Sequence, residues 1–305
     1  MEANRLQISV ATGRFTLPVV CLVCILLWLF QADSWTEAGI FVIAVLTGYL
    51  MIEANVTFLL IRARTTLPVC IYWFLLAVMG FLHPFQWSHL AVPAFVSAVF
   101  SLFYSYDSSH LVFPIFHTFF FLSLGSLVFP QLLYYALPFL FGALVFRSFP
   151  VKGFFAALLG LLAPYWLLFG HAFWCGEMQL FYEPFQELFR FYPIGWSEIR
   201  TVEWISWGVI IALQAVSSIH YFMVAYQDKT RTRCFLFFWL YIGIFTAVFG
   251  LLQPCHLSVL LPLQLICTSF LAAHLFTLTK NRFSSVLFVV TLISFFILTC
   301  FNLWM

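Results

Sequence analysis

The chain has 305 residues, of which 64% are hydrophobic and 8% are charged, and its formal net charge is +2. A soluble domain carries about 25% charged residues because its surface faces water. This composition and the mean hydropathy of +1.04 exclude a soluble globular protein. They predict an all-α polytopic transmembrane helix bundle that forms a single integral membrane domain over residues 1–305. A basic face on such a protein suits an anionic membrane leaflet and needs no nucleic-acid partner.

The number of membrane spans follows from the apolar runs between polar breaks, since a span needs about 20 apolar residues. About eleven are predicted: 15–31, 39–61, 66–82, 90–105, 111–129, 131–146, 153–170, 204–226, 234–251, 257–279 and 284–303. Two of them, 90–105 and 131–146, reach only about 24 Å at 1.5 Å per residue, so ten spans remain an alternative. The first run lacks a small-residue cleavage site after it, which predicts a retained signal anchor.

The positions of the basic residues predict the orientation, because short loops rich in Lys and Arg stay in the cytoplasm. With the N-terminus inside, eleven of the thirteen basic residues fall on the inner side and seven of the eleven acidic residues on the outer side. We therefore expect the N-terminus inside and the C-terminus outside in a bacterial inner (cytoplasmic) membrane. Membrane lipids are then the immediate partners of the chain.

One connection, residues 171–203, is much longer than the others and lies on the predicted outer (periplasmic) side. Within it we expect Pro184 to open a helix over about 184–192. Phe181, Phe185, Leu188 and Tyr192 form one apolar stripe, and Glu187 can pair with Arg190 at i, i+3. These features predict an amphipathic helix at the outer membrane interface, either a structural cover or a lid over a substrate cavity.

Ionisable and polar groups at membrane depth are costly, so each one is a functional candidate. The intramembrane candidates are Glu53, Asn55, His117, His220 and His274. For the histidines the alternative is a neutral ring that donates to a carbonyl on a neighbouring helix. Glu53 is either protonated, paired with a histidine or turned toward a polar cavity.

Acidic residues near the outer surface form a second set of candidates, with Asp33 and Glu183 as possible catalytic bases. The sequence contains no phosphate-binding loop, dinucleotide fingerprint or zinc-protease motif, so it predicts no cofactor and no metal site. Cys175 and Cys255 both fall in outer loops, which leaves a disulfide between them open.

Four stretches of the chain resemble a family of uncharacterised polytopic membrane proteins from Bacteroides-type and Flavobacterium-type bacteria. They are EANVTFLLIRARTTLP (53–68), FFLSLGSLVFPQLLYYALPFL (120–140), VFRSFPVKGFFAALLGLLAPYWLLFGHAF (145–173) and SSIHYFMVAYQDKTRTR (217–233). This resemblance implies an inner-membrane location and supplies no catalytic residues. The order of the middle helices is also similar to glycosyltransferases that use polyprenyl-phosphate sugars, in which Asp33 matches the catalytic base by order.

Three classes of function stay open. The first is an accessory or assembly component of cell-envelope biogenesis, whose outer loop binds an envelope protein. The second is a glycosyltransferase-like enzyme that acts on a lipid-linked substrate. The third is a transporter or lipid flippase with Glu53 in its path.

Overall fold

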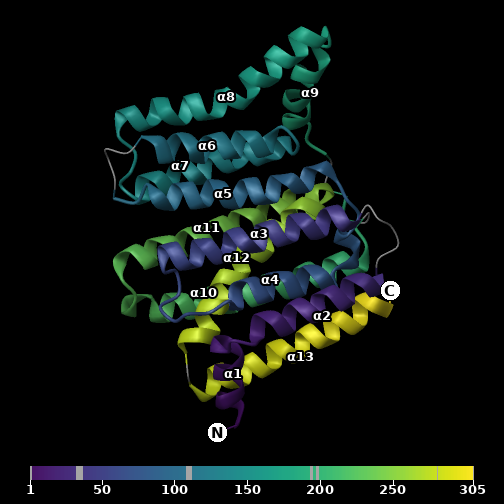
Figure 1. The fold of residues 1–305 in the computed structure, drawn as a ribbon, viewed down its shortest axis with the longest axis vertical. Helices are drawn as coiled ribbons and strands as arrows, with labels where there is room; N and C mark the ends of the chain where they lie inside the picture. The colour runs from purple at the N-terminus through teal and green to yellow at the C-terminus, as the bar shows by residue number, and fades with distance from the viewer. Residues whose placement is uncertain are drawn as a thin grey trace. The chain divides into compact units, whose positions relative to one another are not determined.

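The computed structural model describes residues 2–31, 37–107, 112–192, 195–196, 199–279 and 281–304, with side chains described from residue 6 onward. Every regular element within these ranges is helical, which confirms the predicted all-α class (Figure 1). The chain divides into two compact units where the sequence analysis predicts one domain over 1–305. Unit 1 is Met1–Phe85 with Ile194–Met305, and unit 2 is Gln86–Pro193.

Unit 1 contains both ends of the chain. Its α-helices are α1 (Glu2–Thr12), α2 (Thr16–Gln31), α3 (Glu37–Phe58), α4 (Leu67–Val78), α10 (Thr201–Val224), α11 (Thr230–Leu252), α12 (Leu257–Leu278) and α13 (Arg282–Trp304). Short 3-10 turns follow α4 (η1, Gly80–Leu82) and α10 (η5, Ala225–Gln227) and precede α12 (η6, Pro254–His256).

Unit 2 holds the middle of the chain. Its helices are η2 (Trp87–Leu90), α5 (Ala91–Tyr104), α6 (Phe113–Ser126), η3 (Pro130–Tyr135), α7 (Ala136–Val145), α8 (Val151–Cys175) and α9 (Gln179–Leu188).

The apolar helices agree with the predicted membrane class. Among the described residues, seven helices are long and apolar enough to cross a membrane, and α1 with α2 makes an eighth if the bent pair is one span. Three shorter apolar segments, Leu67–Val78, Phe113–Ser126 and Pro130–Val145, also lie in predicted spans. The protein is therefore a membrane protein with several candidate spans. The count of eleven and the orientation stay predictions.

Helix α9 is the amphipathic helix of the long connection, but its predicted bounds are wrong. It begins at Gln179 rather than at Pro184, which lies buried within it, and it ends at Leu188 rather than near 192. The aromatic side chains before Pro184 extend the helix, because Phe181 packs on Phe169 of α8 with ring centroids 5.4 Å apart. The predicted pair is confirmed, with Arg190 Nη1 3.1 Å from Glu187 Oε1.

Helix α12 is the centre of unit 1. Apart from Ser258, every residue from Leu257 to Thr277 is buried, and α12 packs against α4, α10 and α11. Burying a polar group without a hydrogen bond costs free energy, and two polar side chains of α12 find that bond on α10. The Gln214 side chain of α10 accepts hydrogen bonds from Gln264 and from Thr268.

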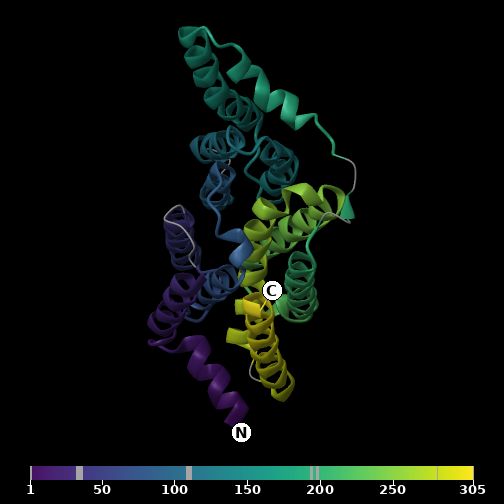
Figure 2. The same ribbon diagram turned by 90° about the vertical axis from the view of Figure 1, so that its right-hand side faces the viewer.

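Helix α1 crosses the end of unit 1 instead of continuing α2, because the chain bends by 84° between Thr12 and Thr16. It packs against α12 and α13 (Figure 2). The last carbonyls of a helix lack partners within it, and the buried Gln7 amide donates to those of Phe276 (2.7 Å) and Thr279 (2.8 Å). Gln7 also accepts from Ser285 of α13 at 2.9 Å, so one side chain joins three helices.

Helix α4 runs between α2 and α3 and packs against both (Figure 1). Trp73 of α4 lies directly on Gly48 of α3, and its indole N–H donates to the carbonyl of Ala44 at 2.9 Å. A Cβ at Gly48 would lie 2.4 Å from Trp73 Nε1. Only glycine therefore permits this approach of the indole to the α3 backbone.

The far end of α2 is held by a buried histidine that follows α4. The His83 ring stacks on Trp28 with centroids 3.9 Å apart, and its Nε2 lies 3.3 Å from the carbonyl of Leu76. Burial lowers the pKa of His83 from its ordinary value of 6.5, partly offset by that carbonyl and by Glu37. The neutral ring is the form that suits the stack.

Replacing Gly48 with alanine tests the contact between α3 and α4. The added methyl must displace the indole, and overpacking of this kind costs about 1–3 kcal/mol. We expect Gly48→Ala to lower the thermal unfolding midpoint of the purified protein in detergent. Gly208→Ala in α10 is the matched control, because a Cβ there meets nothing within 4 Å. Equal midpoints for the two variants would contradict the packing.

The lowered pKa of His83 predicts a loss of stability in acid. Below about pH 6.5 the unfolded chain binds a proton at this histidine that the folded chain does not bind, so folding becomes less favourable as the pH falls. We expect the unfolding midpoint to drop more between pH 7.5 and 5.5 in the wild type than in His83→Phe, which keeps a ring against Trp28. Identical drops would show that His83 does not contribute.

Candidate functional site

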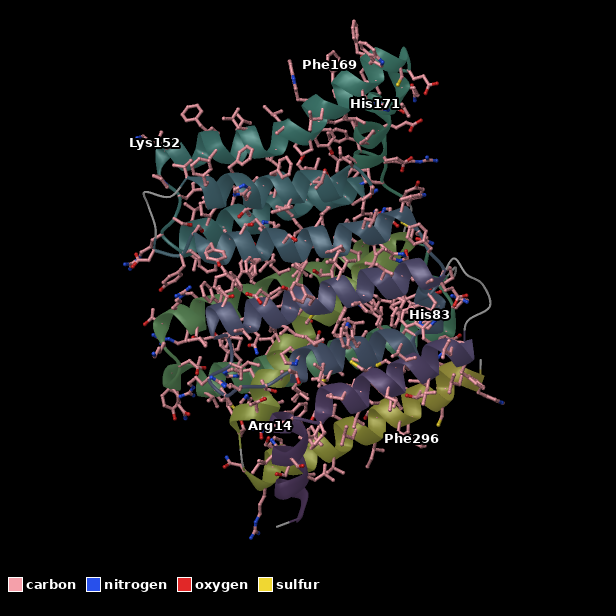
Figure 3. All side chains as sticks on the ribbon, in the orientation of Figure 1. Arg14, His83, Lys152, Phe169, His171 and Phe296 are labelled. Atoms are coloured by element: carbon pink, nitrogen blue, oxygen red, sulfur yellow. The ribbon has the colours of Figure 1, made fainter. Side chains whose placement is uncertain are left out.

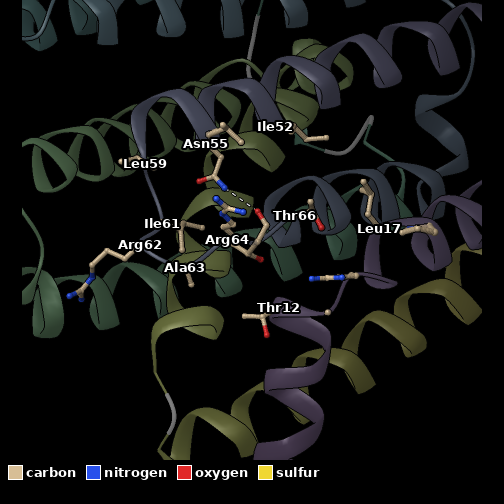
Figure 4. Close-up of a pocket in the computed structure, with 15 residues that line it drawn as sticks. Thr12, Leu17, Ile52, Asn55, Leu59, Ile61, Arg62, Ala63, Arg64 and Thr66 are labelled. Carbon is tan, nitrogen blue, oxygen red and sulfur yellow. Dashed lines mark hydrogen bonds between the residues drawn. The ribbon is translucent and has the colours of Figure 1, made fainter.

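A pocket of about 800 Å³ opens where α1, α2, α3 and the α3–α4 connection meet (Figure 4). We call it the arginine pocket. Its lining comprises Thr12, Gly13, Arg14, Leu17, Pro18, Ile52, Asn55, Val56, Leu59, Ile61, Arg62, Ala63, Arg64, Thr65 and Thr66. The arginines of the lining come from the α1–α2 bend and from the α3–α4 connection, and α2 and α3 contribute aliphatic side chains.

The end of α3 shapes the connection that carries two of the arginines. Leu59 directly follows α3 and has a φ of 51°, the left-handed conformation that ends many helices. Glycine usually occupies such a position, because a side chain there is strained. The chain then turns through residues 60–66 before Pro68 allows α4 to begin.

Thr65 forms hydrogen bonds with α3, with α1 and with the start of α4, and so joins these helices around the pocket. Its carbonyl accepts from the Asn55 amide of α3 at 3.0 Å, and its hydroxyl donates to the carbonyl of Ala11 in α1. The same hydroxyl accepts from the backbone N–H of Leu67 at 3.1 Å, at the start of α4. Asn55 is 8% exposed, and its Oδ1 has no hydrogen-bond partner among the described residues.

The three arginines differ in their partners. Arg62 turns away from Asn55, and its Nε lies 3.0 Å from Oδ1 of Asp228, whereas Arg64 turns toward Asn55 (Figure 4). Neither Arg14 nor Arg64 forms an ion pair with a described carboxylate. The pocket therefore presents two positive charges that no acidic side chain of the described chain neutralises.

Asp228 lies behind the pocket and connects it to α12. Its side chain is fully buried, and Oδ2 lies 2.9 Å from Nε2 of His274. The His274 ring lies 6.3 Å from that of His220 in α10, and His220 Nε2 lies 2.6 Å from the Thr279 hydroxyl. A buried carboxylate is stable only with partners of this kind, so Asp228 holds Arg62 and thereby the α3–α4 connection in place.

The chemistry of the arginine pocket is that of anion binding. A guanidinium carries five donors in a planar fork that matches the oxygens of a phosphate or carboxylate. Within the described chain, no group of three or more His, Cys, Asp or Glu side chains is arranged to hold a metal ion.

The structure brings together three of the predicted intramembrane candidates at this end of unit 1. Asn55 lines the pocket, and His220 and His274 lie behind it. Sequence reasoning missed Arg14, Arg64 and the Arg62–Asp228 pair as site residues. A signal was present, since the predicted orientation places all four on one side of the membrane.

The other candidates lie elsewhere. Glu53 is exposed on α3 and accepts from Thr57 at 3.2 Å, and it does not line the pocket. His117 is exposed on α6 among Phe113, Phe116 and Phe121, and Glu183 is exposed on α9. Asp33 lies outside the described residues. Cys175 and Cys255 carry free thiols.

Comparison with known proteins finds no matching family model, no similar curated protein and no solved structure with a matching fold. The resemblance to the uncharacterised Bacteroides-type family therefore stays a prediction.

Replacing Asp228 with asparagine tests the support of the pocket. The change leaves Arg62 without its counter-charge and weakens the bond to His274. We expect a loss of about 3 kcal/mol, the lower end for breaking a buried pair, because the Arg62 side chain is 44% exposed. The measurement is the thermal unfolding midpoint. Asp107→Asn is the control, since Asp107 is exposed and asparagine tolerates its φ of 54°. A loss in the control as large as in Asp228→Asn would contradict this role.

Proposed function

We propose that this chain is a multi-pass protein of a bacterial inner membrane that binds the phosphate headgroup of an anionic membrane lipid in the arginine pocket. The observation that carries the proposal is the presence of two unneutralised arginines, Arg14 and Arg64, beside the aliphatic ends of α2 and α3. Basic pockets between transmembrane helices on the cytoplasmic side bind the headgroups of anionic lipids.

The proposed orientation, with about eleven spans, the N-terminus inside and the C-terminus outside, puts this pocket at the cytoplasmic surface. The gathering of basic residues at one end of unit 1 supports it. Arg14 and Arg64 line one pocket, and Arg231 lies over the ring of Phe58 at the end of α3, 5.9 Å from its centroid. Figure 3 shows Arg14 and His83 at opposite ends of the ribbon of α2, so the arginine pocket lies at the end of α2 away from His83.

A lipid is favoured over a free anion because of the composition of the pocket. A site for inorganic phosphate needs no apolar surface, whereas Leu17, Ile52 and Val56 extend the lining along the two helices. A phosphate joined to a hydrocarbon chain uses both parts of the lining.

Among the classes of function, we propose an accessory or assembly component of the cell envelope that carries this lipid as a bound part of its structure. An enzyme or a flippase for a lipid-linked substrate would use the same pocket and in addition turn the lipid over or convert it. Turnover or transbilayer movement of the bound lipid would therefore decide against the accessory role.

Native mass spectrometry of the purified protein tests lipid binding. We expect phosphatidylglycerol to bind more tightly than phosphatidylcholine, and inorganic phosphate to compete weakly. The double variant Arg14→Gln with Arg64→Gln should bind phosphatidylglycerol about thirtyfold more weakly, since each cation near an anionic lipid contributes about 1 kcal/mol and 1.4 kcal/mol is a factor of ten.

Lys152→Gln with Arg282→Gln is the matched control, because it removes two exposed cations that are not part of the pocket lining. An equal loss in the control would show that net charge alone attracts the lipid. No preference for phosphatidylglycerol in the wild type would overturn the proposal.

A further inference from the structure

A second cavity, an apolar trough separate from the arginine pocket, lies between α2 and α3. It has a volume of about 260 Å³ and lies between Cys21, Cys24 and Trp28 of α2 and Phe41, Ala44 and Val45 of α3. Trp73 and Leu76 of α4 complete its lining. No Asp, Glu, Lys, Arg or His stands among these residues.

The trough exists because of how α4 packs. Helices α2 and α3 each pack extensively against α4 and much less against one another. Since Gly48 lets Trp73 lie against the α3 backbone, the indole lines the trough between the two helices. Cys24, Ala44 and Leu76 are buried, while Ile25 and Val45 are exposed at the rims.

The trough and the pocket lie on the same helix faces. On α2, Leu17 of the pocket and Cys21, Cys24 and Trp28 of the trough follow at spacings of four, three and four. These spacings place them on one side of a helix. On α3, Ile52 of the pocket lies two turns from Val45 of the trough, with Gly48 between them.

We infer that the trough binds one hydrocarbon chain of the lipid whose headgroup the arginine pocket holds, an inference that rests on the proposed function. The length agrees with a single leaflet. On α2 the trough runs from Cys21 to Trp28, seven residue steps or about 10 Å, which fits within half of the hydrocarbon core of a bilayer, about 15 Å.

The trough is too small for a helix of a partner protein. A helix about 10 Å wide would need roughly 800 Å³ over the length of the trough, against the trough volume of about 260 Å³. A single unbranched chain is the component of a membrane that is both thin and apolar enough. Because the chain comes from an apolar solvent, it gains close packing rather than hydrophobic free energy. The trough therefore orients the lipid, and the arginines select it.

Depth-resolved photolabelling in nanodiscs tests this inference. Two phosphatidylglycerol probes carry a diazirine on one chain, either near the ester or at the chain end. We expect the first to label the region of Leu17 and Ile52, and the second that of Trp28, Phe41 and Val45, as mapped by peptide mass spectrometry.

A bulky residue at the rim supplies the matched comparison. Val45→Trp should abolish labelling of the trough by the chain-end probe, whereas Val42→Trp, which changes an exposed position outside the trough, should not. Both variants are first checked for an unchanged unfolding midpoint and, if Val45→Trp fails to fold, Ile25→Phe at the opposite rim replaces it.

The outcomes separate the two proposals. The chain site is wrong if the trough is labelled no more strongly than the exposed face around Leu22, Leu29 and Val42. It is also wrong if the rim variants leave the labelling of the trough unchanged. In both cases the selectivity of the arginine pocket for the headgroup stands. If a phosphatidylcholine probe labels the trough as strongly as the phosphatidylglycerol probe does, the chain in the trough does not belong to a lipid selected by the arginines. A wild type that shows no lipid preference in native mass spectrometry refutes the proposed function itself, and with it this inference.

Discussion

The pocket end of unit 1 depends on the partners that three polar side chains buried on α12, those of Gln264, Thr268 and His274, find inside the protein. In an apolar solvent an unpaired polar group costs several kcal/mol. His274 meets the requirement through Asp228, and Gln264 and Thr268 meet it through Gln214. Asp228 in turn needs a positive charge, which Arg62 supplies. Through Asp228 and Arg62, the buried His274 thus holds the α3–α4 connection, which forms one wall of the arginine pocket.

The same requirement explains the unusual course of the N-terminal segment. Gln7 satisfies the last carbonyls of α12, which holds α1 across the end of the bundle instead of in line with α2. Thr65 then joins α1 to the start of α4. As a result Arg14, which sits at the bend, lines the same pocket as Arg64 although fifty residues separate them in the sequence.

The arginine pocket and the trough are complementary parts of one amphiphilic surface. Charge is left unneutralised where a headgroup would lie, and the adjoining helix faces carry no ionisable group other than cysteine thiols. Small residues make this possible, since Gly48 and Ala44 bring the α3 backbone close to Trp73 and leave room above it. The surface therefore combines selection by charge with orientation by shape.

Composition alone predicts an all-α membrane protein, because a chain with 8% charged residues cannot cover a surface that faces water. The sequence also located the apolar helices to within a few residues and predicted the Glu187–Arg190 pair, since both depend on short-range periodicity. It placed α9 five residues too late, because the packing of Phe181 on α8 outweighs the local preference of Pro184 for a helix start. Which polar residues contact one another can be read from the tertiary structure alone. The pairing of His274 with Asp228, the exposure of Glu53 and the joining of Arg14 to Arg64 depend on which helices are neighbours, and periodicity within one helix does not encode its neighbours.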